Sequence, residues 1–138
     1  MVRYSNKQRD LTDRKSKYTT PEEVMQAFQT EKENRIAREI FEYVNCLPNA
    51  DYYISNGIMF KRAGRKFKFL SISTVGNKLL FHVPIQRRDE IYHTYKDTVS
   101  IDIPTDPRDK NQIDIQLVDI HSLESVRELI QIAHNERE

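Results

Sequence analysis

The residues best suited to chemistry in this sequence are basic, and they lie in a stretch without acids. From residue 52 to residue 88 there is no Asp or Glu, but there are eight Lys and Arg residues: Lys61, Arg62, Arg65, Lys66, Lys68, Lys78, Arg87 and Arg88. The aromatic residues interleaved with them are Tyr52, Tyr53, Phe60 and Phe67. Lys and Arg contact phosphate groups, and aromatic rings stack on nucleic-acid bases. The pattern therefore predicts a basic sheet face that binds a polyanion, either nucleic acid or an acidic protein surface.

The charge of the whole chain conceals this stretch. The formal net charge is only +1, because residues 89–138 contain twelve acids against five bases. Such segregation creates local fields of opposite sign. Two other interpretations stay open. Bases on strands also protect sheet edges from aggregation. Alternatively, the acidic C-terminal third of one copy pairs with the basic centre of another, giving a homo-oligomer or a protein-protein accessory module that would suit a phage or mobile element.

Metal and nucleophile chemistry have little support. The four histidines, His82, His93, His121 and His134, form no H-x-x-x-H or H-E-x-x-H pair. Cys46 is the single cysteine, so neither an intrachain disulfide nor a thiolate cluster forms, and we expect a small buried side chain there. We expect His82 to lie exposed beside basic neighbours on the polar side of its strand. We predict no metal, no cofactor and no catalytic residue.

An enzymatic alternative rests on paired carboxylates. Asp89 with Glu90, or Asp106 with Asp109, would hold a divalent ion in a small metal-dependent nuclease or hydrolase. The chain has no acid-x-Lys pattern on a predicted strand, no G-x-S-x-G turn and no P-loop. We therefore favour a non-enzymatic binding module and keep the nuclease as the alternative.

The elements that must position these residues begin and end with helices. Thr20 and Thr30 are each followed three residues later by Glu, which predicts two capped helices, the first with Pro21 in its first turn. The second helix has one apolar stripe and ends before Pro48. Ser122 is expected to cap a last helix, whose apolar face contains Leu123, Val126, Leu129, Ile130 and Ala133.

Between these helices the hydrophobic period changes to two, which is typical of strands. Alternation and β-branched or aromatic content predict strands over residues 58–61, 66–72, 79–85, 99–103 and 113–117. Ala63-Gly64 and Gly76-Asn77 supply the turns that join the first three. Residues 89–96 fit either a short helix or an irregular connection.

This order predicts an α+β fold in which an antiparallel sheet of four or five strands packs against N-terminal helices and one C-terminal helix. One sheet face should be covered by helices and the other available to solvent or a partner. Residues 19–138 fit a single domain, while the polar, basic residues 1–18 predict a flexible arm. Without a long apolar run or a signal sequence, and with one cysteine, the chain is expected to be a cytoplasmic protein that does not enter a membrane.

A pattern between residues 36 and 133 resembles a known family. Its first part consists of residues 40–44 (IFEYV), 57–62 (GIMFKR), 66–67 (KF) and 78–81 (KLLF). Its last part consists of residues 113–117 (IDIQL), 122–126 (SLESV) and 129–130 (LI). In these segments the chain is similar to the small "predicted transport protein" domain, which is often appended to nuclease-like chains. That family typically has a His-Trp-Gly-like segment before its penultimate strand, where this chain has Asp109-Lys110-Asn111-Gln112. The resemblance implies an α+β fold and no particular activity.

Overall fold

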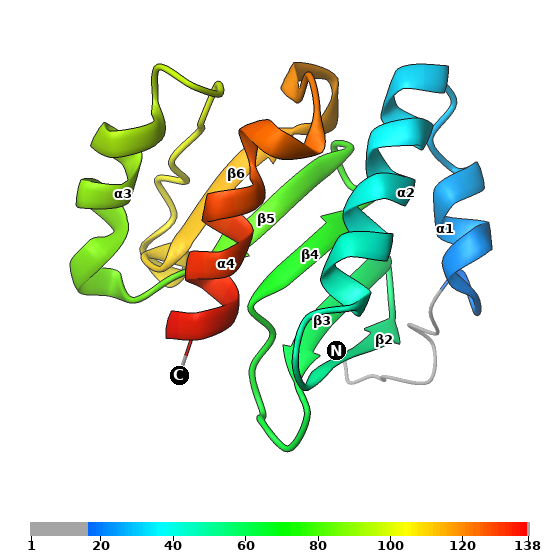
Figure 1. Cartoon of the computed structure of the whole chain (residues 1–138), viewed down its shortest axis with the longest axis horizontal. Helices are drawn as coiled ribbons and strands as arrows, with labels where there is room; N and C mark the ends of the chain where they lie inside the picture. Colours follow the sequence, from blue (N-terminus) through cyan, green and yellow to red (C-terminus); the bar gives the residue numbers. More distant parts are fainter. Residues whose placement is uncertain (1–16, 138) are drawn as a thin grey trace, which may run out of the picture.

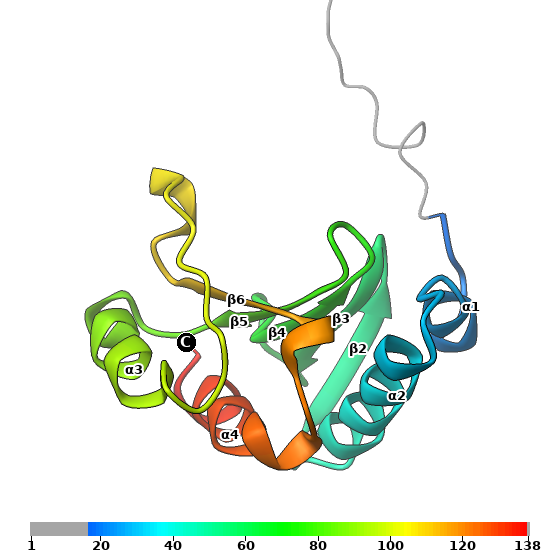
Figure 2. The same cartoon turned by 90° about the horizontal axis from the view of Figure 1, so that it is seen from above.

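A computed structural model describes residues 17–137 of the chain. Its antiparallel sheet has the order β2-β3-β4-β5-β6, with β2 at Ala50–Ile54, β3 at Gly57–Arg62, β4 at Leu70–Ser73, β5 at Lys78–His82 and β6 at Gln112–Gln116 (Figure 1). The helices are α1 (Pro21–Gln26), α2 (Glu31–Asn45), α3 (Arg88–Tyr95) and α4 (Arg127–Glu136). Seen from above, they gather on one side of the sheet (Figure 2). The predicted α+β fold class is confirmed.

The core lies between the sheet and the helices because paired residues on neighbouring strands share a face. Two rows point toward the helices: Tyr52, Phe60, Leu70, Phe81 and Ile113 in one, and Ile54, Ile58, Ile72, Leu79 and Ile115 in the other. Apart from Tyr52 and Ile54 on the edge strand, all of them are fully buried. Helices α2 and α4 complete the core with Ile36, Ile40, Val44, Leu129, Ile130 and Ala133.

The opposite face of the sheet is less accessible than strand alternation predicts. Its central row is Tyr53, Met59, Ser71, Leu80 and Asp114. Ser71 lies directly between Met59 and Leu80 and is fully buried. Longer side chains at this spacing cover a small one. Tyr53, which is 45 % exposed, is the most accessible member of the row.

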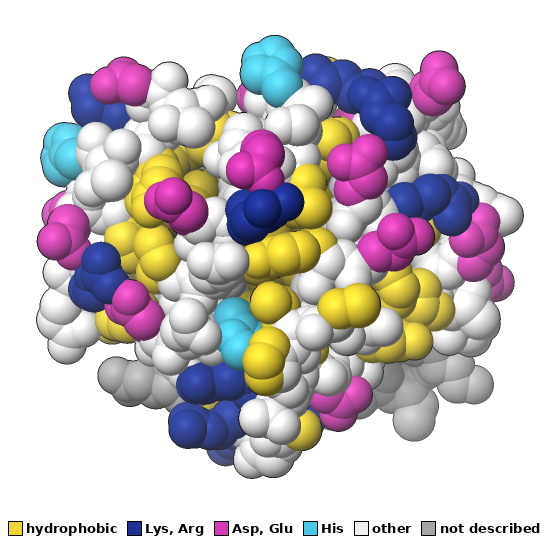
Figure 3. Space-filling model, in the orientation of Figure 1, with side chains coloured by type: hydrophobic (Ala, Val, Ile, Leu, Met, Phe, Trp, Pro, Cys, Tyr) yellow, Lys and Arg dark blue, Asp and Glu magenta, His cyan; other side chains and the backbone are white. Residues whose placement is uncertain are grey.

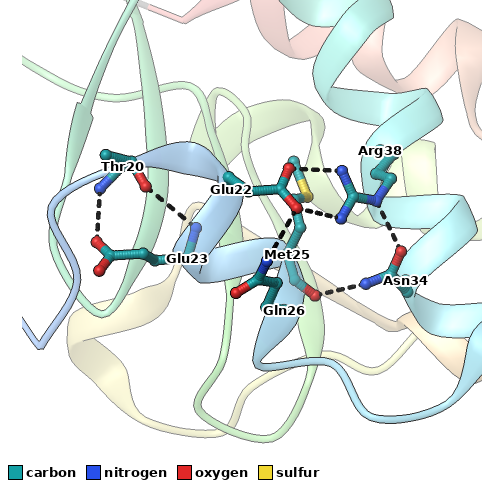
Figure 4. A network of polar contacts seen from close by, with 7 residues as sticks. All are labelled: Thr20, Glu22, Glu23, Met25, Gln26, Asn34 and Arg38. Atoms are coloured by element: carbon teal, nitrogen blue, oxygen red, sulfur yellow. Dashed lines mark hydrogen bonds and ion pairs between the residues drawn. The ribbon is translucent and has the colours of Figure 1, made fainter.

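Both predicted helix starts are confirmed. Thr20 accepts a hydrogen bond from the Glu23 backbone N–H, and the Glu23 carboxylate accepts one from Thr20, which completes a capping box (Figure 4). Thr30 accepts a bond of 3.1 Å from the Glu33 backbone N–H at the start of α2. Such caps satisfy N–H groups that have no partner inside the helix.

Polar contacts hold α1 against α2 (Figure 4). The Arg38 guanidinium donates two hydrogen bonds of 2.7 Å to the Glu22 carboxylate, and it lowers the pKa of that carboxyl. Asn34 donates a bond of 2.8 Å to the Met25 carbonyl oxygen. Exposed ion pairs of this kind add little stability, so α1 depends mainly on the buried side chains of Val24, Met25 and Phe28.

Two strand assignments differ from the structure. Residues 50–54 form the edge strand β2, which the sequence analysis did not include. Residues 99–103 form no strand and make only one bridge, between Asp102 and Asp114. The Val99 N–H is held by the Tyr95 carbonyl at the end of α3, and Pro104 has no N–H to continue a ladder.

Several element boundaries also shift. The predicted strand 66–72 begins only at Leu70, and the strand 79–85 ends at His82 because a 3-10 turn starts after Pro84. Residues 89–96 are mainly helical, as part of α3. The last helix begins at Arg127, not after Ser122, because residues 123–125 form a 3-10 turn and the Ser122 side chain caps nothing.

No helix among residues 17–137 is long and apolar enough to cross a membrane. The predicted arm, residues 1–18, lies outside the described residues except for Lys17 and Tyr18. Tyr18 packs against the hydrophobic core.

Gly57 is a position where β3 and β4 approach closely. A Cβ atom there would lie 2.0 Å from the Ile72 carbonyl oxygen, so the two strands would have to separate. We expect Gly57→Ala to lower the free energy of unfolding, measured in urea, by about 3 kcal/mol. Gly64→Ala is the control, because its Cβ meets nothing within 4 Å and only the φ of +81° costs energy, about 1–2 kcal/mol. A smaller loss at Gly57 than at Gly64 would contradict the close approach.

Candidate binding site at the β3–β4 end of the sheet

The structure separates the eight predicted binding residues into groups. Five lie at the end of β3 and in its connection to β4: Lys61, Arg62, Arg65, Lys66 and Lys68. Lys78 pairs with Ser73, which pairs with Gly57 at the start of β3, so Lys78 lies at the other end of the sheet. Arg87 and Arg88 lie at the start of α3. The eight bases therefore do not share one sheet face.

Strand alternation also divides the two bases that end β3. Lys61 lies on the face away from the helices, opposite Asp51 on β2. Arg62 lies on the helix side, where its guanidinium donates a hydrogen bond to the backbone carbonyl of Arg137 after α4. Consecutive strand residues point to opposite faces, so a run of neighbouring bases cannot form one face of a regular strand.

Three of the eight bases are held within the fold by contacts with the acidic C-terminal third of the chain, residues 89–138. The Lys78 ammonium lies 3.6 Å from the Asp114 carboxylate. Burial raises the pKa of Asp114, and Gln112 and Lys78 oppose this effect. Arg87 pairs with Glu90 and Glu136. Arg88 donates a hydrogen bond of 2.8 Å to the Asp109 carbonyl oxygen. These three bases thus have structural partners.

An exposed aromatic ring lies in the same connection as three of the remaining bases. Phe67 is 53 % exposed, and two cations lie over it: the Lys66 ammonium is 5.5 Å and the Arg137 guanidinium carbon 5.1 Å from the ring centroid. We call Arg62, Arg65, Lys66, Phe67, Lys68 and Arg137 the basic platform. Figure 3 shows Lys and Arg side chains gathered at the lower end of the molecule, between the chain end after α4 and the β3–β4 connection.

Arg137 is the platform residue that the sequence analysis missed. Its Nε donates a hydrogen bond of 3.0 Å to the Lys68 carbonyl oxygen, and its own carbonyl accepts from Arg62. These bonds join residues far apart in the sequence. The acid-rich segment around Arg137 concealed it, and only the docking of α4 beside the β3–β4 connection brings it to Phe67.

A local irregularity lies just before β4, where Phe69 is buried and Phe67 is exposed. Leu70 pairs with Phe60, yet the Phe69 N–H also bonds to the Phe60 carbonyl, at 2.8 Å. Two residues therefore face one, which is the arrangement of a β-bulge. Phe69 is fully buried, with its ring centroid 5.2 Å from that of His134 on α4. In a regular strand Phe67 and Phe69 would share a face.

His82 lies beside the platform and is buried, contrary to the sequence expectation. It is only 8 % exposed, and its Nε2 has no hydrogen-bond partner among the described residues. Burial is the main cause that lowers its pKa to about 4; the positive charges of Lys68 and Arg137 act in the same direction, and a hydrogen bond with Asn111 opposes them. The imidazole is therefore neutral at pH 7.

The other candidates for chemistry remain scattered. Asp89 is exposed, and Asp106 forms an ion pair with Arg108, which lowers the Asp106 pKa. Cys46 is exposed at the end of α2, so the expectation of a buried side chain is wrong. Within residues 17–137, no three His, Cys, Asp or Glu residues come close enough together to hold a metal ion.

Comparison with known proteins adds no relative. No family model matches the chain, and no curated protein or solved structure matches it either. The resemblance to the "predicted transport protein" domain therefore stays a prediction, and the geometry of the platform is the basis for assigning a function.

His82 should make the protein less stable in mild acid. Its pKa of about 4 in the folded chain lies below the ordinary 6.5, so the unfolded chain takes up the proton first as the pH falls. This contribution to stability is complete above pH 6.5 and is lost toward the folded-state pKa, by up to about 3 kcal/mol.

The measurement is the free energy of unfolding in urea across this pH range. His82→Gln should flatten the decline, because glutamine does not titrate. His93→Gln, at an exposed position of α3, serves as the control and should retain the wild-type slope. A His82→Gln profile parallel to that of the wild type would show that His82 is not the responsible group.

Proposed function

We propose that this protein is a non-enzymatic module that binds nucleic acid through the basic platform. The supporting observation is a set of three bases that form no ion pair in the described part of the chain and that flank an exposed ring in the sequence. Among residues 17–137, none of Arg65, Lys66 and Lys68 forms an ion pair, although acids pair with Lys78 and Arg87 elsewhere in the fold. Unpaired Lys and Arg side chains gain most from phosphates, because they release the counterions bound to the nucleic acid.

The backbone of the platform favours binding without large rearrangement. The connection between β3 and β4 is anchored on both sides, by Arg62 at its start and by buried Phe69 at its end. The Arg65 N–H also bonds to the Arg62 carbonyl at 2.9 Å, which closes a turn. A connection held at both ends costs less conformational entropy to order when a ligand binds.

Charge reversal in the platform should abolish most of this binding. We expect Lys66→Glu with Lys68→Glu to weaken the affinity for a labelled oligonucleotide at least tenfold at about 50 mM salt. The slope of log K against log salt should fall by about 1.4, because two phosphate contacts at about 0.7 each are lost. Fluorescence anisotropy over a salt series with both DNA and RNA measures the two quantities.

The matched control is Lys32→Glu with Lys96→Glu, which changes the net charge equally at the other end of the sheet. Lys32 contacts the Val118 carbonyl, beyond the far end of β6, and Lys96 follows α3. This control should retain the wild-type slope. The proposal fails if the wild type shows no binding at low salt, or if both double variants weaken binding equally. Preference for an acidic polypeptide over the oligonucleotide would also overturn it.

A further inference from the structure

Phe67 presents an exposed aromatic ring, which a purely electrostatic site does not need. Its ring is 53 % exposed, whereas Phe28, Phe60, Phe69 and Phe81 are almost completely buried. One exposed apolar side chain is ordinary by itself. Here, however, two cations lie over the ring, and one of them, Lys66, forms no ion pair within residues 17–137.

The two cations over the ring differ in how firmly they are held. Arg137 is fixed by its 3.0 Å bond to the Lys68 carbonyl and by the bond from Arg62 to its own carbonyl. Lys66 is exposed, and within the described residues its ammonium contacts only the Phe67 ring. An exposed cation–π contact is weak, so Lys66 is able to leave the ring and meet a phosphate. Ring surface then becomes available while Arg137 keeps its place.

We propose that the platform binds single-stranded nucleic acid, with one base stacked on Phe67 and the adjacent phosphates on Lys66 and Lys68. This inference rests on the proposed function and specifies its ligand. Base stacking on aromatic rings beside a cationic groove is how strands are bound without sequence preference. In a duplex, neighbouring bases cover both faces of each base, so only an unpaired base offers a face to the ring.

The surroundings of Phe67 argue against the other use of an aromatic ring on nucleic acid. Side chains that kink a duplex enter between base steps as wedges and must project beyond their neighbours. Phe67 instead lies beneath Lys66 and Arg137, and almost half of its surface is covered. It therefore does not project beyond its neighbours as a wedge does.

The first test compares strands that differ only in their bases. Phe67→Ala should lower the affinity for a single strand of about 12 nucleotides by about tenfold, within the range for loss of one base–aromatic stack. It should leave the affinity for an abasic strand of the same length unchanged, because that strand has the same phosphates. Tyr53→Ala, at a 45 % exposed ring on β2, is the control and should bind both strands as the wild type does.

The second test reports on stacking directly. The chain contains no tryptophan, so Phe67→Trp introduces a single indole at the platform. Its fluorescence should be quenched by the single strand, and not by the abasic strand or by polyglutamate of equal charge. Because Phe67 is exposed, these variants should unfold in urea at the wild-type midpoint, which separates a binding defect from a folding defect.

The outcomes distinguish this inference from the function on which it rests. If Phe67→Ala binds the single strand as tightly as the wild type while Lys66→Glu with Lys68→Glu does not, the nucleic-acid module stands and base stacking is wrong. Equal or tighter binding of a matched duplex would also overturn the single-strand assignment. If neither the single strand nor the duplex binds the wild type at low salt, both proposals fail.

Discussion

The proposed site depends on one junction, the packing of His134 against two other parts of the chain. Its Nε2 lies 2.8 Å from the Pro48 carbonyl oxygen, in the link between α2 and β2, and its ring meets the edge of Phe69 in the β4 bulge. His134 is itself 7 % exposed. One turn of α4 thus packs on the bulge that precedes β4, and Arg137 follows three residues later at the Phe67 ring. Without this docking, the β3–β4 connection would have bases but no ordered aromatic surface.

The distribution of charge along the chain gains a structural meaning from this arrangement. Two of the eight central bases pair with acids inside the fold, Lys78 with Asp114 and Arg87 with Glu136. Five of the other six lie at the end of β3 and in the β3–β4 connection. A net charge near zero therefore coexists with a local positive field, and the proposed function depends on the local field.

Local signals predicted much of the fold, and long-range contacts account for what they missed. Capping at Thr20 and Thr30 and the alternation in β5 and β6 depend on neighbouring residues, so they were visible in the sequence. Burial of His82 and the approach of Arg137 to Phe67 depend on where α4 docks, which no local pattern specifies. The β4 bulge likewise breaks the period of two that placed Phe67 and Phe69 together. Four of the eight predicted bases belong to the platform, but its fifth base, Arg137, could be found only in three dimensions.

Backbone carbonyl oxygens hold two arginines of the platform in place. Arg62 donates to the carbonyl of Arg137, and Arg137 donates to that of Lys68. A carbonyl accepts the guanidinium N–H groups and fixes their direction, but it has no net charge to cancel theirs. Carboxylates at these positions would orient the arginines equally well and would also repel a phosphate. His82 is a buried neighbour of Lys68 and Arg137, and its lowered pKa keeps it uncharged at neutral pH. It therefore adds no further positive charge beside them. The bond to the Arg137 carbonyl therefore orients Arg62 without cancelling its charge.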